Sequence, residues 1–392
     1  MAGRSLLFIP GPTNVPDRIL RAMHRPQEDH RSPDHPTLVR GIFEDLKPVF
    51  GTTVGRAFVF PSSGSGMWET ALINTLAPGA KVLVVRKGQF SHLFADICTR
   101  LGYATEIIDV EWGAATPPDR IAAALEADRQ HEIQAVCVVH NETATGVTSD
   151  IPAIRAAMDT ARHPALLFVD GVSAIASLDF QLDAWGVDAS ITGSQKGFMM
   201  PAGLGILAMS PKALARVADS TQPRGYFDLR PMIAANDTGY FPYTPSIPLL
   251  HGLREALDML REEGLPAVIA RHARLAGGVR AAVGAWGLSL CAKDPARASN
   301  TVSAIMTPEG VNAADVIRVA YQRHQVSLGA GLARMAGKLF RIGHLGDLNE
   351  WMILGGLGAV ELALRDVGVR VAPGSGVAAA QGFWEAHPRP AA

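Results

Sequence analysis

The sequence has 392 residues, of which 48% are hydrophobic and 19% charged, and at roughly 150 residues per domain it is long enough for two or three domains. Its formal net charge is -1 and it contains no basic block, which argues against nucleic acid and membrane surfaces as partners. Its three cysteines suit neither a disulfide framework nor a zinc site, so we expect a cytoplasmic protein without a metal centre.

The first half of the sequence alternates short apolar runs with longer stretches of helical pattern, which is typical of a mainly parallel sheet wrapped by helices. We expect seven strands, at residues 57–60, 81–85, 105–108, 135–139, 165–169, 189–192 and 203–209. We expect crossover helices at residues 67–76, 91–101, 118–127 and 152–161. These elements predict one large α/β domain.

The second half has a different texture. A loop rich in Pro, Gly and Tyr is expected at 222–248, followed by helices at 249–263 and 266–283. A smaller α+β domain is expected from strands at 301–306 and 338–342, helices at 312–323 and 348–365, and a tail beyond Val371 that is loosely ordered at its end. We therefore divide the chain into an N-terminal arm (1–20), a large domain (21–255) and a small C-terminal domain with its connecting helix (256–392).

The first chemical signal is Ser62-Ser63-Gly64-Ser65-Gly66, which lies between a predicted strand and a predicted helix. Free backbone N–H groups and the helix dipole favour a phosphate there, and small side chains let an anion reach the backbone. The same sequence also suits a simple turn. It is neither a P-loop nor a full dinucleotide fingerprint, because no Gly-Lys-Ser/Thr follows and the third glycine is absent.

Two ionisable residues follow predicted strands of the same sheet. Asp170 comes directly after the apolar run 165–169, at the edge where open α/β sheets bind ligands, although a loop or capping role is also compatible. Lys196 lies in Gly193-Ser194-Gln195-Lys196-Gly197, where small neighbours leave space beside the amine and the apolar run 198–201 favours its neutral form. A Schiff-base role for Lys196 competes here with an ordinary solvated lysine.

Arg341 is placed inside the apolar run Leu339-Phe340-Arg341-Ile342. A buried guanidinium needs a partner, and its planar fork matches a carboxylate with two parallel hydrogen bonds. The partner is either a substrate carboxylate or an acidic side chain in a structural salt bridge. Polar residues at another strand end, His140, Asn141 and Thr143, are candidates for the same cleft.

These motifs occur in an order that resembles class V aminotransferases of fold type I, most closely the alanine-glyoxylate and serine-glyoxylate enzymes. The resemblance also includes Pro10-Gly11-Pro12-Thr13-Asn14-Val15-Pro16, residues 140–146, Val169-Asp170-Gly171-Val172-Ser173 and Arg341-Ile342-Gly343, and so covers almost the whole chain. It implies an α/β fold with a seven-stranded, mainly parallel sheet in a domain that binds pyridoxal 5'-phosphate (PLP).

The resemblance also implies roles for individual residues. Lys196 is the catalytic residue that forms the Schiff base with the cofactor, Asp170 pairs with the pyridinium nitrogen, and Thr143 hydrogen-bonds the phenolic oxygen. Val172 and Phe90 pack on the ring, with Phe90 standing where relatives often have a tryptophan.

The cofactor phosphate and the substrate are assigned from the same resemblance. The phosphate ligands implied are Ser65, Gly66, Met67 and Gln195, together with Tyr243 and Thr244 from a second subunit. The residues implied for the substrate are Arg341, which would bind the carboxylate, Gly11 and Asn14. Phe241 falls where alanine-preferring relatives have a phosphate-contacting tyrosine, so that role passes to Tyr240 or Tyr243, or lapses.

The stretch 238–245 resembles bacterial serine-glyoxylate enzymes, so we expect an amino group to move from serine to glyoxylate. We also expect a homodimer, or a dimer of dimers, with active sites at the subunit interface. Alanine as donor and another PLP reaction such as a lyase or desulfurase remain open. So do a nucleotide-dependent oxidoreductase using the 64–66 turn and a non-catalytic amino-acid-binding protein, for which Lys196 has no evident use.

Overall fold

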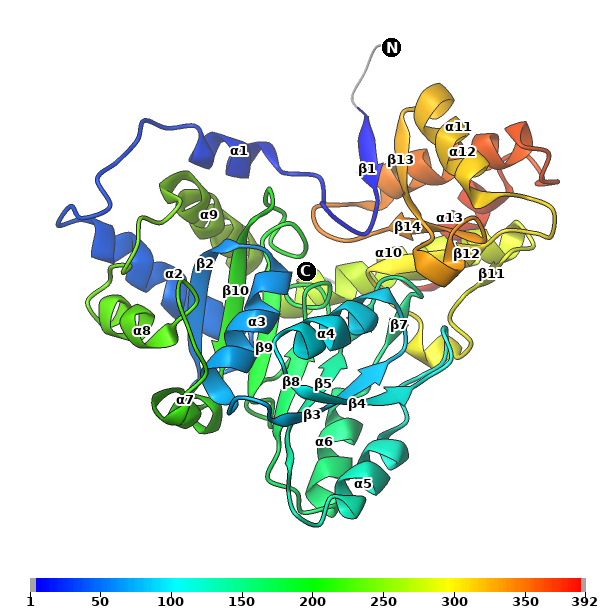
Figure 1. Cartoon of the computed structure of the whole chain (residues 1–392). Helices are drawn as coiled ribbons and strands as arrows, with labels where there is room; N and C mark the ends of the chain where they lie inside the picture. Colours follow the sequence, from blue (N-terminus) through cyan, green and yellow to red (C-terminus); the bar gives the residue numbers. More distant parts are fainter. Residues whose placement is uncertain (1–4, 389–392) are drawn as a thin grey trace.

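The computed structural model describes residues 5–388. They form a large and a small α/β domain, each built on one sheet that is packed against helices (Figure 1). The large sheet has seven strands in the order β2-β10-β9-β8-β5-β3-β4. Their bounds are β2 Arg56–Ser62, β3 Lys81–Arg86, β4 Ala104–Asp109, β5 Ile133–Val139, β8 Leu166–Asp170, β9 Ala189–Gly193 and β10 Gly203–Met209. Only β10 runs antiparallel to its neighbours, so the predicted mainly parallel sheet is confirmed.

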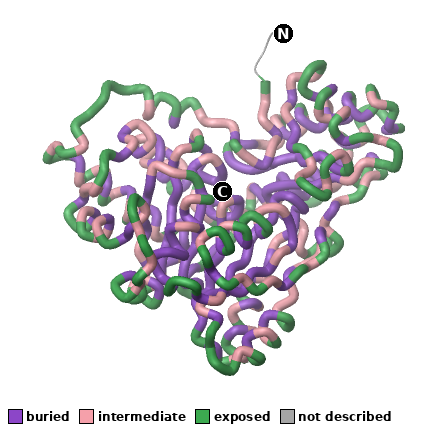
Figure 2. The backbone as a smooth tube through the Cα atoms, in the orientation of Figure 1, coloured by how far each residue is buried: buried purple, intermediate pink, exposed green. Residues whose placement is uncertain are grey.

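Helices cover both faces of this sheet because its strands are apolar on both sides. In β3, Leu83 and Val85 enter one buried cluster, while Val82 and Val84 enter the other. The first cluster includes residues of α2 His35–Val49, α5 Pro118–Ala127, α6 Ile151–Thr160 and α9 Ile247–Glu263. The second includes residues of α3 Gly64–Thr75, α4 Gln89–Arg100, α7 Pro211–Asp219 and α8 Leu229–Asp237. Figure 2 shows the strands buried between these layers.

The small sheet has five strands in the order β1-β13-β14-β12-β11. Their bounds are β1 Leu6–Phe8, β11 Ser289–Leu290, β12 Val302–Met306, β13 Val326–Ala330 and β14 Leu339–Gly343. Its helices are α10 Leu265–Ala285, α11 Ala313–His324, α12 Glu350–Asp366 and α13 Ser375–Ala386. Because β1 pairs in parallel with β13, the N-terminal arm is built into the C-terminal sheet.

Several elements differ from the sequence-based expectation. The loop expected at 222–248 contains α8, and β13 was not predicted. The helix ending near Arg365 is not the last, because α13 forms in the Ala- and Gly-rich tail and packs on α10. A Cβ on Gly278 of α10 would lie 2.5 Å from the Trp384 ring, so tertiary packing at a glycine makes room for this helix. The tail beyond residue 388 lies outside the described residues.

Two short elements complete the frame around the site. A hairpin of β6 Asn141–Glu142 and β7 Val147–Thr148 follows β5, and α1 Asp17–Met23 leads from the N-terminal arm into the large domain. Two 3-10 turns, Pro295–Arg297 and Ala333–Met335, lie in the small domain. Among residues 5–388, no helix is long and apolar enough to cross a membrane.

Candidate active site

The candidate site is a cavity of about 320 Å³ at the carboxyl edge of the large sheet. Strands β8 and β9 are parallel and pair Asp170 with Ile191, so the segments that follow them emerge at the same edge. The lining residues come from six chain segments: Gly11, Pro12, Ser63, Gly64, Ser65, Trp68, Phe90, Asn141, Thr143, Asp170, Val172, Ser173, Gln195, Lys196 and Ala202. The structure therefore brings together Asp170, Lys196, Asn141 and Thr143 as expected, whereas His140 lines a different cavity.

Lys196 is the buried amine of this cavity. Its side chain is 8% exposed, and burial, together with the nearby Arg341 guanidinium, lowers the pKa of the amine to about 8. Its Nζ donates to the carbonyl of Pro10, and a Cβ on Gly11 would lie only 2.6 Å from Nζ. The N-terminal arm thus passes directly against the lysine at a residue without a side chain. A desolvated lysine near neutrality is a competent nucleophile.

Asp170 is the buried carboxyl group of the same cavity. Burial raises its pKa to about 7, while the Val172 N–H, which donates to Oδ1 at 2.8 Å, partly opposes that rise. The nearby Glu142 carboxylate raises the pKa further. A carboxylate in this setting gains from a cationic partner in the cavity.

The turn between β2 and α3 forms the small-residue end of the cavity. Ser63, Gly64 and Ser65 line it, whereas Gly66 and Met67 lie in the same helical turn but not among the lining residues. A Cβ on Gly64 would lie 2.5 Å from Val172 Cγ2, so α3 can start this close only with glycine. Gln195 also lines the cavity, and its Oε1 is buried without a hydrogen-bond partner. The first N–H groups at the start of α3 suit an anion, whereas the unpaired Gln195 oxygen is an acceptor that needs a hydrogen-bond donor.

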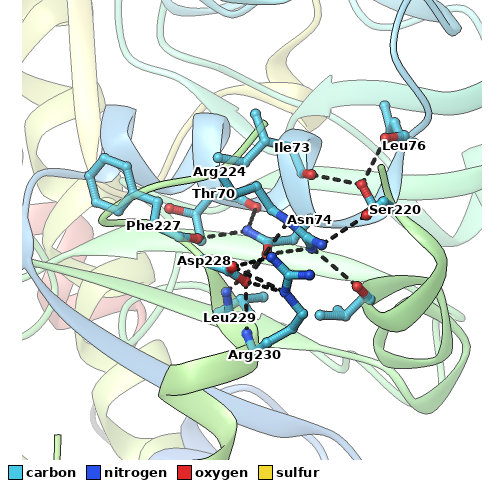
Figure 3. Close-up of polar contacts among 11 residues, drawn as sticks. Thr70, Ile73, Asn74, Leu76, Ser220, Arg224, Phe227, Asp228, Leu229 and Arg230 are labelled. Carbon is cyan, nitrogen blue, oxygen red and sulfur yellow. Dashed lines mark hydrogen bonds and ion pairs between the residues drawn. The ribbon is translucent and has the colours of Figure 1, made fainter. Parts of the chain in front are cut away.

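Helix α3 is fixed at its other end by a buried amide, Asn74 (Figure 3). Its Nδ2 donates to the Phe227 carbonyl at 2.8 Å, and its Oδ1 accepts the Leu229 N–H at 2.9 Å and Arg224 Nη1 at 3.1 Å. These bonds attach the loop after α7 to α3. The Phe227 ring lies 3.2 Å from the position that a Cβ on Gly66 would take. The loop therefore supports the turn at the cavity.

Arg341 lies on β14 and connects the small sheet to the cavity wall. Its Nη1 donates to the Thr143 carbonyl at 3.1 Å and its Nε donates to the Ala330 carbonyl at 2.9 Å. Burial lowers the pKa of its guanidinium to about 10. In the described part of the chain it has no carboxylate at ion-pair distance, so the structural salt bridge considered from the sequence is absent there. Arg341 is not among the residues that line the cavity.

Three other expected site residues are placed elsewhere in this single chain. Asn14 uses its amide on the backbone of Leu7, donating at 2.9 Å and accepting at 3.1 Å. Tyr243 is 41% exposed and stacks on Tyr226 with ring centroids 5.1 Å apart, and Thr244 follows it outside the cavity.

Glu142 is a site residue that sequence reasoning missed. It is fully buried and accepts the N–H groups of Ser91 at 3.0 Å, Ala144 at 3.2 Å and Phe90 at 3.3 Å. It thereby holds the Phe90 segment against the hairpin that carries Thr143. No local sequence pattern singled it out, since Glu142 lies three residues after the end of β5, in the short strand β6 Asn141–Glu142. Trp68 and Ser173 also line the cavity without having been assigned to it, and Asn141 lies there as expected.

Comparisons with known proteins agree with this geometry. The family model described as aminotransferase class-V matches residues 6–340. A serine–glyoxylate aminotransferase of Methylorubrum extorquens is 57% identical over 98% of this chain and 97% of its own length. An L-aspartate–glyoxylate aminotransferase of Paracoccus denitrificans is 49% identical over 97% of this chain and 96% of its own length. The solved structure of pyridoxamine-pyruvate aminotransferase from Mesorhizobium loti is similar with a TM-score of 0.92 and 28% identity, over 99% of this chain and 98% of that one.

The fold, together with a buried lysine and a buried aspartate lining one cavity, defines a PLP-dependent transferase of fold type I. Within that class, the chain belongs to the class V aminotransferase family. The residues present fit the cofactor: a buried amine for its aldehyde, a carboxyl group whose pKa burial raises for its ring nitrogen, and the N–H groups at the start of α3 for its phosphate. The nucleotide-dependent oxidoreductase considered from the sequence is thereby set aside.

Proposed function

We propose that this aminotransferase moves the amino group of L-serine to glyoxylate, giving hydroxypyruvate and glycine. The observation that carries the choice of substrates is the 57% identity, along the whole chain, to a relative named serine–glyoxylate aminotransferase. The cavity is consistent with small substrates, because its 320 Å³ must hold both the cofactor and the reacting amino acid.

When bound, PLP supplies an electron sink for the bond that breaks at the donor's Cα. Lys196 would hold the cofactor through its Nζ and, once released from it, would carry the proton that leaves the donor's Cα. Its lowered pKa serves both tasks, because the amine is partly neutral near pH 7 and still able to accept a proton. Asp170 holds the ring nitrogen protonated, as its buried position beside the cavity allows.

Other residues that line the cavity would orient the cofactor. Phe90, Val172 and Thr143 line the cavity, so the first two would pack on the ring and the Thr143 hydroxyl would hydrogen-bond its phenolic oxygen. The phosphate binds at Ser65, Gly66, the Met67 N–H and Gln195, with Tyr243 and Thr244 supplied by a second copy of the chain.

The substrate is bound near the arm. Arg341, with no carboxylate of its own, takes the α-carboxylate of donor and acceptor, and Gly11 leaves room for the substrate beside Lys196. Asn14 acts indirectly on substrate binding, because its amide donates to the Leu7 carbonyl and so fixes the arm that carries Gly11. A cytoplasmic homodimer, or a dimer of dimers, completes each site from two subunits.

A panel of amino donors with glyoxylate as the common acceptor tests the substrate assignment. We expect kcat/KM to be highest for serine. L-Aspartate is the second candidate, because the Paracoccus relative at 49% identity is named for it, and alanine is the third. Serine ranking below either would refute the donor assignment. Borohydride reduction followed by peptide mapping tests the site, since the cofactor should be fixed to Lys196.

A further inference from the structure

Lys87 is a buried cation that the proposed chemistry does not use. It directly follows β3 and is 1% exposed. Its Nζ donates to Ser149 Oγ at 2.7 Å and to the Val147 carbonyl at 3.3 Å. Within residues 5–388 no carboxylate lies at ion-pair distance from it. Burying an ammonium without an ion-pair partner costs free energy. The two hydrogen bonds that Lys87 makes therefore indicate which segments its side chain holds together.

The contacts of Lys87 join two segments that form walls of the cofactor cavity. Val147 belongs to β7, whose hairpin with β6 carries Thr143 at its tip, and Ser149 follows that hairpin. The backbone N–H of Lys87 donates to Ser91 Oγ at 2.9 Å, in the first turn of α4 next to Phe90. The Lys87 side chain therefore reaches from the α4 side to the far strand of the hairpin.

Glu142 joins the same two segments from the opposite strand of the hairpin. It accepts the Ser91 N–H and the Ser91 hydroxyl, each at 3.0 Å. The hairpin is consequently held by a buried cation on one strand and a buried anion on the other. The two charges attract through the protein interior, where screening by salt is weak.

We propose that Lys87 is a positioning residue: its buried ammonium holds the β6–β7 hairpin against the start of α4 and so sets the spacing between the Thr143 and Phe90 walls of the cofactor cavity. This inference rests on the proposed roles of Thr143 and Phe90 toward the cofactor ring. Lys87 itself contacts neither cofactor nor substrate.

The charge of Lys87 changes near neutral pH. Burial lowers the pKa of Lys87 to about 7, with Arg297 lowering it further and Glu142 raising it. The other groups that face this region are His140, whose pKa burial lowers to about 3 so that it stays neutral, and Asp150, which is paired with Arg297 at 2.7 Å. Lys87 is thus the group here that gains or loses charge between about pH 6 and pH 8.5.

Lys87→Met tests the proposal, because methionine keeps a long unbranched side chain without the charge. The measurement is the dissociation constant of PLP for the full-length chain, at about pH 6 and about pH 8.5. At the lower pH we expect the variant to bind PLP about tenfold more weakly than the wild type, the scale of one charge-assisted hydrogen bond. At the higher pH we expect the ratio to approach one, because wild-type Lys87 is then neutral as well.

The proposal would be overturned if the dissociation constants of the variant and the wild type were equal at both pH values. It would also be overturned if the variant bound PLP more weakly by the same factor at both. Lys81→Met is the matched control, since Lys81 starts the same strand but is paired with Glu132 at the surface, and its ratio should stay near one throughout. Thermal unfolding of Lys87→Met should occur at or above the wild-type temperature. This result would show that weaker PLP binding comes from a displaced hairpin and not from destabilisation of the whole protein. Failure of the wild type to attach PLP at Lys196 would instead refute the proposed function.

Discussion

Replacing Asp170 with asparagine should slow the chemistry while stabilising the cofactor-free protein. Asparagine has the same shape, and its Oδ1 can still accept the Val172 N–H that Asp170 accepts at 2.8 Å. The amide cannot keep a pyridine nitrogen protonated, so we expect proton removal from the donor's Cα to slow by at least ~10²-fold, as for loss of a typical electrostatic contribution. Cofactor binding should change less.

The stability effect follows from the pKa of Asp170. Without cofactor, burial raises this pKa from 3.8 to about 7, so the folded state holds a proton that the unfolded state releases between those values. Stability contributed by the neutral carboxyl group is present below the unfolded pKa and is lost as the pH rises toward 7. At about 1.4 kcal/mol per pKa unit, the cost of the ionised form reaches ~4 kcal/mol above pH 7.

The assay compares Asp170→Asn with Asp96→Asn, an exposed acid on α4. In chemical unfolding of the cofactor-free proteins at about pH 8, the Asp170 variant should gain up to ~4 kcal/mol and the Asp96 variant none. Saturating PLP should reduce the difference in unfolding free energy between the Asp170 variant and the wild type, because the ring nitrogen then pairs with Asp170 in the wild type. No gain in stability would refute the burial argument, and a near-normal single-turnover rate would show that Asp170 is only a structural acid.

Three further substitutions have defined outcomes. Lys196→Ala should abolish turnover with the fold intact by circular dichroism, and borohydride should no longer fix the cofactor. Gly11→Ala should reduce cofactor attachment at least ~10-fold, measured by absorbance, because φ is +105° and the new Cβ would lie 2.6 Å from Lys196 Nζ; full attachment would show that the arm moves freely. Arg341→Lys should weaken serine and glyoxylate together by about 1–3 kcal/mol, because lysine loses the paired contact. Single-turnover rates of both half-reactions check this, and slowing of only one contradicts it.

The large sheet could be predicted because its strands are buried on both faces and read as continuous apolar runs. Asp170 and Lys196 could be placed together for a related reason: each follows a strand of that sheet, and the carboxyl ends of parallel strands meet at one edge. Helix α13 could not be predicted in this way, because its Ala- and Gly-rich sequence has low intrinsic amphipathicity and is held by packing against the glycines of α10.

The buried charges beside the site, Lys87 and Glu142, could not be predicted from the sequence for a different reason. Lys87 stands in Arg86-Lys87-Gly88-Gln89, which is typical of a solvated turn, yet a hairpin some 60 residues later buries it. Glu142 similarly belongs to that hairpin but binds the start of α4, 51 residues earlier for Ser91. Both burials arise from contacts between distant segments, and local composition carries no trace of them.

The resemblance assigned Gly11 to the substrate pocket without a physical reason, and the structure supplies one. Strand β1 pairs with β13, so the arm leaves the small sheet close to β14 and must cross the cavity to reach α1. At that crossing the Pro10 carbonyl meets Lys196 Nζ, and only a residue without a Cβ can follow it. Arg341 on β14 reaches the Thr143 carbonyl from the same side. The Lys196 amine is therefore covered by the arm that leaves the small sheet, so a substitution in the arm can act on a residue of the large domain.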